Sequence, residues 1–253
     1  MTQSVELPGY AAGVRLVAIK ELRGYFDSPI AYIYAAVFLV LSGTTFMNSF
    51  FLDGVVDMSR YFEVLPYLLI PFVPAITMRS WSEEHAQGTL EILLTLPLRL
   101  RQIVLGKYIA TLGFYLIVLF GSLPIVAMLV SLGKPDLGLI AAGYLGGLLM
   151  GALFLAFGML LSALTHNQIV AFVVSTLLGF LLVFSGHPQV VEVIDGLLPD
   201  RQLGSWIAES ISLLPHFEAF AQGIVGLDHS LYFLLMVGFF LWMTELGLQR
   251  VRS

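Results

Sequence analysis

The charged side chains best placed to bind a partner gather in one stretch, residues 82–107, which reads SEEHAQGTLEILLTLPLRLRQIVLGK. Its acids, Glu83, Glu84 and Glu91, could form ion pairs with bases of another protein. Only 11% of the 253 residues are charged, so a polar stretch between two long apolar segments needs an explanation. The residues alone leave two interpretations open. The stretch is either a surface helix that merely connects its neighbours or a docking element for a partner.

Other chemistry finds little support in the sequence. The chain has no cysteine, which excludes disulfides and thiol chemistry. The phosphate-binding pattern GxxxxGK[ST] is absent, because Gly106 and Lys107 are followed by a tyrosine, so any ATP must be hydrolysed on another chain. His187, His216 and His229 are 29 and 13 residues apart, which matches no zinc-ligand spacing, and we expect surface or interface roles for them. We therefore predict no catalytic, metal-binding or cofactor-binding residue and no enzyme activity in this chain.

The composition is that of an integral membrane protein. Hydrophobic residues make up 58% of the chain and the mean hydropathy is +0.91, far more apolar surface than a water-soluble domain needs. A bilayer core about 30 Å thick requires roughly 20 apolar residues per helix, so the length allows roughly five to seven spans. Little of the chain remains for a soluble domain.

The apolar segments predict an all-α polytopic membrane protein with six transmembrane helices. These cover residues 30–51, 62–78, 103–132, 137–164, 169–186 and 231–248. Residues 137–191 contain no Asp, Glu, Lys or Arg, which is too long for one span at about 1.5 Å per residue, so we divide them at the polar residues 165–168. Residues 10–27 are too charged to span and predict an amphipathic helix in the interface plane. Residues 187–230 predict short amphipathic helices on the outer side, and the whole chain, 1–253, is expected to be one transmembrane domain.

The distribution of basic residues predicts the orientation. With the N-terminus in the cytoplasm, the inner segments hold nine bases and the outer segments three, which satisfies the positive-inside rule. The inner bases are Arg15, Lys20, Arg23, Arg79, Arg99, Arg101, Lys107, Arg250 and Arg252, and the outer ones are Arg60, Lys134 and Arg201. We therefore expect a multi-pass protein of the bacterial inner membrane with both termini in the cytoplasm.

This orientation places residues 82–96 in the cytoplasm as a short amphipathic helix. Ser80 followed by Glu83 fits a capping box at its start, and Pro97 stops it. Leucines at 90, 93 and 94 would form one apolar stripe. Gly88 either weakens this helix or lets another backbone approach it closely.

Residues 83–110 resemble the corresponding loop of ABC-2 type permeases. The pattern of that family is E-[ER]-x-x-x-G-T-L-E-x-L-L-x-[ST]-P-[LVI], followed after a short gap by V-x-G-K. The matching residues are Glu83, Glu84, Gly88, Thr89, Leu90, Glu91, Leu93, Leu94, Pro97, Gly106 and Lys107. A minor departure is Leu96, where many members carry serine.

Two further stretches, residues 20–43 and 213–234, resemble the gliding-motility-associated (GldF) branch of the family. The pattern H-F-x-x-F-x-x-G-[VI] of that branch is matched by His216, Phe217, Phe220, Gly223 and Ile224. The NosY-like permeases of nitrous-oxide reductase maturation are close relatives of this branch, and the sequence does not separate the two.

The resemblance implies an ABC-2 or type V exporter-like fold and names the working parts. Residues 82–96 would be the coupling helix, which docks in a groove of a cytoplasmic ABC ATPase. Its coupling surface would consist of Glu83, Glu84, Gly88, Thr89, Leu90 and Glu91. The permease would act as a homodimer or pseudo-dimer with two ATPase subunits, which carry the ATP and Mg. An accessory membrane or periplasmic protein is a further expected partner, and no nucleic acid is.

The candidate pathway residues are mildly polar ones within the spans. In the family, the first and fifth spans meet at the dimer centre, which implies that Thr45, Asn48, Ser175 and Thr176 lie near a central path. Most such hydroxyls are expected to bond within their own or a neighbouring helix. The small-residue ladder of Gly143, Gly147 and Gly151 favours helix packing within one subunit over a dimer seam.

The expected function is therefore that of the permease subunit of an ATP-driven exporter. Two alternatives stay open: a non-transporting membrane anchor that passes ATPase motion to a periplasmic machine, and an ion-coupled secondary carrier. The carrier is disfavoured because its spans would need buried ionised groups, and Glu245, near the inner end of the last span, is expected to snorkel or to pair with a base such as Arg250 rather than to carry a proton. The sequence leaves the cargo unidentified.

Overall fold

The computed structural model describes residues 9–54, 56–95, 97–197 and 202–252. Within these ranges all regular secondary structure is helical, which confirms the predicted all-α class. The first helix, α1 (Tyr10–Asp27), has the bounds predicted for the interfacial helix, and Ser28 separates it from the first long apolar helix, which begins at Pro29. Proline disfavours a helical conformation in the residue before it, so the chain turns at Ser28.

Five helical segments are long and apolar enough to cross a membrane. They are α2 (Pro29–Asp53), α3 (Ser59–Thr77), α6 (Leu100–Phe120) together with α7 (Leu123–Leu132), α8 (Leu137–Ala163) and α13 (Leu227–Arg252). A sixth candidate is the pair α9 (Gln168–Phe184) and α10 (Pro188–Leu197), which meet at a bend of 79°. The six predicted spans thus correspond to five continuous candidates and one bent pair.

The third predicted span, residues 103–132, is interrupted. The chain turns at Gly121 and Ser122, and α7 begins with Pro124 in its first turn, where the missing N–H of proline is tolerated. The Ser122 hydroxyl donates to the Leu119 carbonyl at 2.7 Å and lies 2.7 Å from the Tyr144 hydroxyl. These bonds satisfy polar groups that the interruption of the helix would otherwise leave unpaired inside the protein.

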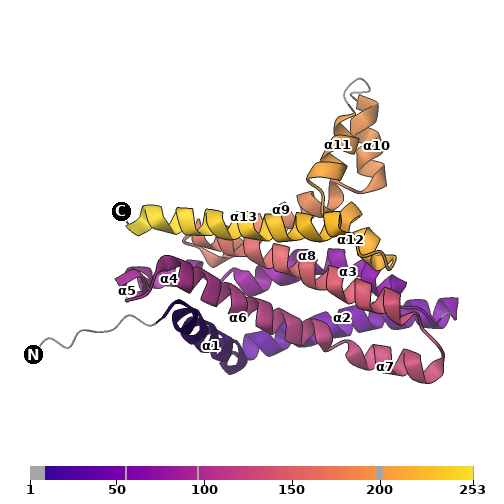
Figure 1. The fold of residues 1–253 in the computed structure, drawn as a ribbon, viewed down its shortest axis with the longest axis horizontal. Helices are drawn as coiled ribbons and strands as arrows, with labels where there is room; N and C mark the ends of the chain where they lie inside the picture. Colours follow the sequence, from indigo (N-terminus) through magenta and orange to yellow (C-terminus); the bar gives the residue numbers. More distant parts are fainter. Residues whose placement is uncertain (1–8, 55, 96, 198–201, 253) are drawn as a thin grey trace, which may run out of the picture.

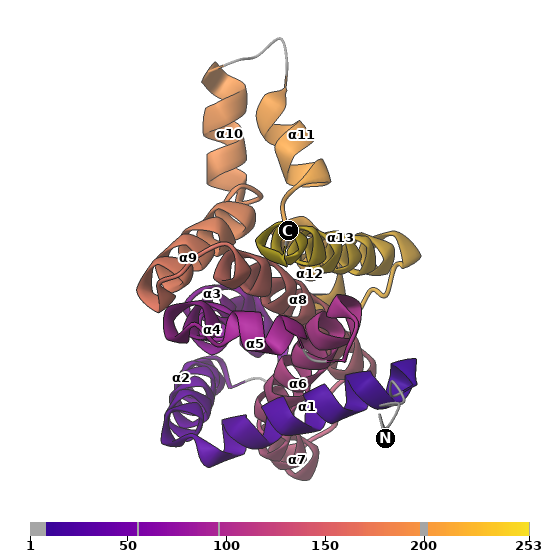
Figure 2. The same cartoon turned by 90° about the vertical axis from the view of Figure 1, so that its left-hand side faces the viewer.

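The spans form an elongated bundle with different structures at its two ends (Figure 1). At one end lie α1, the C-terminal part of α13 and the two short helices α4 (Ser82–Gln87) and α5 (Leu90–Thr95). At the other end lie α7 and α12 (Leu214–Ala221), while α10 and α11 (Leu203–Ser210) form a hairpin that projects sideways. Viewed along the bundle, α1 crosses its end rather than following the spans (Figure 2), as an interfacial helix would.

Helix α8 is the centre of the bundle, and its glycines permit this position. A Cβ atom at Gly143 would lie 2.4 Å from a ring carbon of Phe62 on α3, and one at Gly151 would lie 2.2 Å from Tyr115 on α6. The Tyr115 hydroxyl donates to the Gly147 carbonyl at 2.7 Å. The glycine ladder therefore serves packing within one subunit, as predicted.

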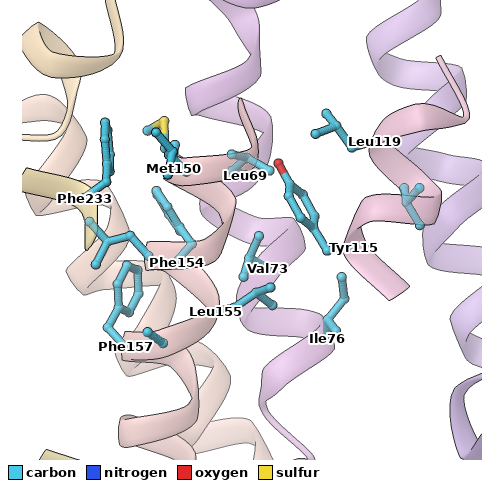
Figure 3. Packing of buried hydrophobic residues seen from close by; sticks show 14 of the residues in the cluster. Leu69, Val73, Ile76, Tyr115, Leu119, Met150, Phe154, Leu155, Phe157 and Phe233 are labelled. Carbon is cyan, nitrogen blue, oxygen red and sulfur yellow. The ribbon is translucent and has the colours of Figure 1, made fainter. Parts of the chain in front are cut away.

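The surrounding core is formed by large apolar side chains from α3, α6, α8 and α13. Figure 3 shows Tyr115 of α6 beside the α3 side chains, with the α8 phenylalanines between α3 and α13. The labelled residues are Leu69, Val73, Ile76, Tyr115, Leu119, Met150, Phe154, Leu155, Phe157 and Phe233. Because lipid tails are as apolar as these side chains, close packing rather than water exclusion holds such a bundle together.

Helix α1 is attached to the bundle through α6. A Cβ atom at Gly106 would lie 2.6 Å from the Cβ of Val17, so the glycine lets the two helices approach closely. The Gln102 side chain donates to the Tyr10 carbonyl at 3.1 Å, close to Gly13. The interfacial helix is therefore fixed to the first turns of α6 by steric fit and by a hydrogen bond.

Candidate functional site

The predicted helix over residues 82–96 is divided into two. Helix α4 ends at Gln87, and Gly88 adopts φ 67°, a left-handed conformation that favours glycine. The N–H of Thr89 bonds to the Glu84 carbonyl at 3.0 Å and that of Gly88 to the His85 carbonyl at 3.3 Å. This pair of bonds is a Schellman motif. The expectation of one helix was wrong because Gly88 ends α4, and α5 then starts at Leu90.

The start of α4 is capped from a distant helix. The predicted capping box of Ser80 and Glu83 does not form, since α4 has no side-chain cap from its own N-cap residue, Trp81. Instead the Ser162 hydroxyl of α8 accepts from the N–H groups of Trp81 and Ser82, at 3.0 and 3.1 Å. The same hydroxyl donates to the Met78 carbonyl at 3.0 Å. One buried side chain of α8 therefore holds the turn between α3 and α4.

Lys107 of α6 joins three helices. Its side chain is 3% exposed, and its ammonium lies 2.9 Å from Glu84 Oε1 of α4 and 3.4 Å from Glu21 Oε1 of α1. It also donates to the Ser80 carbonyl at 2.9 Å and lies 4.9 Å from the centre of the buried Trp81 ring. A buried ammonium is stable only when its charge and its N–H groups are compensated in this way. We call Lys107 and its partly exposed partners Glu21 and Glu84 the buried triad, because the lysine at its centre is buried.

The far side of α4 is attached to the α8–α9 connection. His85 Nε2 donates to the Ala163 carbonyl at 3.1 Å, and its ring meets that of His166 edge to face at 4.6 Å. Arg79, just before α4, contacts the Gln168 side chain of α9 at 3.4 Å. Together with Ser162 and the buried triad, these contacts connect α4 to α1, α6, α8 and α9, which is more than the two flanking spans predicted from the sequence.

The six predicted coupling residues do not share one environment. Leu90 is buried, with 3% exposure, and packs in the core rather than on a docking surface. Glu84 points inward to Lys107, so this carboxylate is already paired within the chain. Glu83 lies 3.5 Å from Arg79 and is partly exposed, whereas Gly88, Thr89 and Glu91 are exposed.

The other residues of the predicted stripe are only partly described. Leu93 is partly buried and packs against the core. The side chain of Leu94 and the whole of Leu96 lie outside the described residues. The exposed residues of the loop are therefore concentrated at the Schellman turn, where Ala86 and Gln87 join the three exposed coupling residues.

A family comparison agrees with this architecture. The model of the ABC-2 family transporter protein family matches residues 43–217, which is more than half of the chain and includes α4, α5 and the spans around them. The chain belongs to the ABC-2 transporter family. Members of this family are the membrane components of ABC transporters, so the protein is a multi-pass membrane protein. No curated protein matches the chain.

The candidate pathway residues of this ABC-2 protein occupy two separate helices. Thr45 and Asn48 lie on α2, and the Thr45 hydroxyl donates to the Leu41 carbonyl of its own helix at 2.8 Å. Ser175 and Thr176 lie on α9, and both hydroxyls are buried without a hydrogen-bond partner. The expectation that such hydroxyls bond locally therefore applies to Thr45 and is wrong for the pair on α9. Both α2 and α9 pack against α3.

Glu245 of α13 pairs with a base, as expected. Arg101 of α6 places its Nε 2.8 and 2.9 Å from the two carboxylate oxygens of Glu245. The side chain of Arg250, the partner suggested by sequence, lies outside the described residues. Arg101 is 65% exposed, so this is a surface ion pair that joins α6 to α13 at the end of the bundle.

Two histidines meet at the opposite end of this ABC-2 protein. Nδ1 of His216 on α12 lies 2.9 Å from Nδ1 of His229 on α13, and the His216 ring stacks on Tyr232. Burial, with His229 as a second cause, lowers the pKa of the His216 imidazole. Among the residues that the structure describes, no group of three or more His, Asp or Glu is arranged to hold a metal ion. The sequence spacing of the histidines gave no indication of this contact.

Sequence reasoning also missed the residues that position α4. Ser162 and His85 belong to no motif, and only the fold brings them to Trp81 and Ala163. Lys107 was visible as the last residue of V-x-G-K, but its partners were not, because Glu21 and Glu84 match no fixed spacing from it. A buried lysine in the first turns of a span was the one available signal, since such a charge needs an acidic partner.

Proposed function

We propose that this chain is the permease subunit of an ABC exporter, which couples ATP hydrolysis on a separate ATPase subunit to the export or extrusion of a substrate. The observation that carries the proposal is the attachment of α4 to three helices, α1, α6 and α8, through Ser162, His85 and the buried triad. An exposed segment with so many connections to spans can transmit a displacement to them. A mere connector between α3 and α6 would need none of these contacts.

The coupling surface in this proposal is the exposed Schellman turn with its flanking acids. Glu83 and Glu91 would meet bases of the ATPase, and Gly88 and Thr89 would let its surface approach closely. No atom lies within 4 Å of a Cβ placed on Gly88, so the space beside it is open. Glu84 and Leu90 have a different role in this proposal, since they attach the turn to α6 and to the core.

The motion would then pass along two routes. Lys107 would carry a displacement of α4 to α6 and α1, and Ser162 would carry it to α8. ATP and Mg would bind only to the partner ATPases, whose closure would push on the coupling surface. A second permease copy would place α2 and α9 at the dimer centre, with Thr45, Asn48, Ser175 and Thr176 near the path. The unpaired hydroxyls of Ser175 and Thr176 support this, because they would gain partners from a polar cargo or from a second copy.

The orientation that fits this function places α1, α4, α5 and the end of α13 in the bacterial cytoplasm. These elements lie at one end of the bundle (Figure 1), where most of the bases counted by the positive-inside rule also lie. The GldF-like or NosY-like branch is supported by the motif of α12, in which His216, Phe217 and Phe220 face α8 and α13. An accessory membrane or periplasmic protein would contact the opposite end.

One alternative remains attractive because of the projecting hairpin. A membrane anchor that transmits ATPase motion to a periplasmic machine would use the same coupling surface and would offer α10 and α11 to its partner (Figure 2). An ion-coupled carrier is less consistent with the spans, because Lys107 is the one charged residue classed as buried among the described residues and it is already paired. Transport that follows an ion gradient without ATP would favour the carrier.

The test is assembly with the ABC ATPase encoded beside this chain. We would compare Glu91→Lys with Glu192→Lys, which reverses an exposed acid on α10 at the opposite end of the bundle. Glu91→Lys is expected to weaken ATPase binding about tenfold or more and to abolish stimulation of ATP hydrolysis, because it opposes like charges across the contact. Glu192→Lys should behave as wild type. Equal binding by both variants would contradict the proposed coupling surface.

A further inference from the structure

A cavity of about 560 Å³ lies where α1, the start of α2, the end of α3 and α4 meet. It lies within one subunit and borders the exposed Schellman turn, since Gln87 and Thr89 are among its lining residues. Its position is the level at which the interfacial helix α1 passes into the first span, so it faces the boundary between lipid headgroups and acyl chains. A volume of this size accommodates a lipid headgroup with the first part of its chains.

The lining of the cavity combines charged and apolar side chains. Its six charged side chains are Lys20, Glu21, Arg79, Glu83, Glu84 and Lys107, and they pair with one another. Tyr25, Ile30, Tyr34, Ile76 and Phe114 contribute apolar and aromatic surface. A purely polar solute would leave this apolar surface without contacts, and a purely apolar one would dehydrate the ion pairs. The cavity therefore fits an amphiphile.

The charges indicate which amphiphile. Three acids and three bases line the cavity, so their formal sum is zero, and an anionic or a cationic headgroup alone would bring an uncompensated charge. A zwitterion matches this wall if its cation meets the acids and its anion meets the bases. The charges are also ordered in depth, because Lys107 is 3% exposed, whereas Lys20 is 72% and Arg79 40% exposed.

The deep part of the cavity leaves one acceptor without a donor. Lys107 donates to the Ser80 carbonyl and to Glu84 and lies 3.4 Å from Glu21, which Lys20 also approaches at 3.7 Å. Glu84 Oε2 is buried and has no hydrogen-bond partner. A carboxylate torsion rotates easily, so a small turn about the last bond of Glu84 would present this oxygen to the cavity. A primary ammonium, with three N–H donors, would supply the missing bond.

We infer that this cavity binds one phospholipid with a primary ammonium headgroup, the chemistry of phosphatidylethanolamine. Its ammonium contacts Glu84, its phosphate contacts Lys20 and Arg79, and its chains follow the wall of Tyr34, Ile76 and Phe114 towards the membrane. The lipid then links α1 to α4 as a third partner of the buried triad. This site depends only on the permease chain and not on the proposed coupling to an ATPase.

The test fills the cavity with a side chain. Gly24 of α1 lines the cavity, and no atom lies within 4 Å of a Cβ placed there, so Gly24→Leu adds volume without a clash and improves helix propensity. Gly238 of α13 also has open space at its Cβ position and is exposed elsewhere on the bundle, so Gly238→Leu is the matched control. Both proteins would be purified alone in detergent and offered an equimolar mixture of phosphatidylethanolamine, phosphatidylcholine and phosphatidylglycerol. Native mass spectrometry counts the lipids that each protein retains.

Wild type and Gly238→Leu are expected to retain one phosphatidylethanolamine, about tenfold over phosphatidylcholine, whose quaternary ammonium has no N–H group. Gly24→Leu should lose this lipid, and Glu84→Gln should lose the preference over anionic phosphatidylglycerol. Equal retention of the three lipids, or full retention by Gly24→Leu, would overturn the inference. Gly24→Leu leaves the buried triad unchanged, so the test stands even if Glu84→Gln fails to fold.

A phospholipid at this site is either a resident structural lipid or the transported cargo. The two are separated by reconstituting the wild-type chain with its ATPase and following labelled phosphatidylethanolamine during ATP hydrolysis. A resident lipid stays bound and does not exchange with turnover, whereas a cargo lipid is released to the opposite leaflet. If the permease fails to couple to any ATPase, the binding measured on the chain alone is unaffected, so the two proposals fail separately.

Discussion

The two ends of the bundle differ in how their short helices are held in place. At the end that holds α4, this short helix is connected to α1, α6 and α8 by Lys107, Ser162 and His85. At the other end, the α10–α11 hairpin is held together by its own Asp195, whose carboxylate accepts from the N–H groups of Gly204 and Ser205 at 2.6 and 3.1 Å. The hairpin projects from the bundle, and its Trp206 and Leu197 are 58% and 75% exposed (Figure 1).

This difference indicates which end can transmit motion to the spans and which can contact a partner without disturbing them. Side chains far apart in sequence connect α4 to the spans, so a displacement of α4 moves the spans with it. The hairpin is stabilised internally, and the bend of 79° between α9 and α10 removes it from the bundle axis. It is suited to contact lipid or a partner without disturbing the core. One end of the protein is thus coupled to the spans and the other is largely independent of them, which agrees with the opposite partners proposed for them.

The largest effect is expected from removing the cation of the buried triad. Lys107→Met leaves Glu21 and Glu84 close together without compensation and should lower the free energy of unfolding by about 3–5 kcal/mol. Thermal unfolding in detergent measures the change. Lys20→Met is the matched control, because Lys20 is 72% exposed and its pair with Glu21 should contribute less than about 1 kcal/mol. Similar losses of unfolding free energy in the two variants would show that Lys107 does not hold α1, α4 and α6 together.

A smaller loss is expected at the α8 contact. Ser162→Ala leaves the buried N–H groups of Trp81 and Ser82 and the Met78 carbonyl without this hydroxyl, at a cost of about 1–3 kcal/mol. Ser131→Ala is the control, since the Ser131 hydroxyl bonds only the Met128 carbonyl of its own helix at an exposed position. Hydrogen exchange should reveal faster opening of α4 in Ser162→Ala alone. Unchanged protection of α4 would show that α8 does not hold it.

The hairpin should respond locally. Asp195→Ala removes the cap of α11 and should speed hydrogen exchange within the hairpin, with little change in the unfolding temperature of the bundle. Hydrogen exchange of α10 and α11, compared with that of α8, measures whether the hairpin opens independently of the bundle. A matching loss of protection in α8 would mean that the hairpin is not independent.

The smallest effect is expected at the histidine contact. Burial lowers the pKa of His216 in the folded protein, so the unfolded chain binds a proton more readily and stability falls as the pH drops below about 6.5. His229 lies 2.9 Å away and Asp228 next to it is exposed, so the full effect is the sum over this group. Unfolding temperatures from pH 8 to 5.5 should fall less in His216→Gln than in wild type. If the unfolding temperature falls equally with pH in both proteins, His216 is not the cause of the pH dependence.

The sequence predicted the fold well because the relevant signals are local. Runs of apolar residues located the spans, and the interfacial helix kept its predicted bounds, since hydropathy and helical spacing are properties of short windows. The pattern around Gly88 located the loop between the second and third spans. The division at Gly88 and the break at Gly121 were missed, because a glycine or proline within an apolar run does not reveal whether the chain continues or turns.

The candidate site could be only partly predicted, for a different physical reason. Gly88, Thr89 and Glu91 are exposed and Glu83 is partly exposed, as a docking loop requires, but the burial of Leu90 and the inward turn of Glu84 depend on helices that cross at this end. The sequence by itself determined that the chain is a helical membrane protein with a polar loop of ABC-2 type. Only the tertiary structure decided that Lys107, Glu21 and Glu84 meet and that Ser162 caps α4, because these contacts join residues 23 to 86 positions apart through the crossing of α1, α4, α6 and α8.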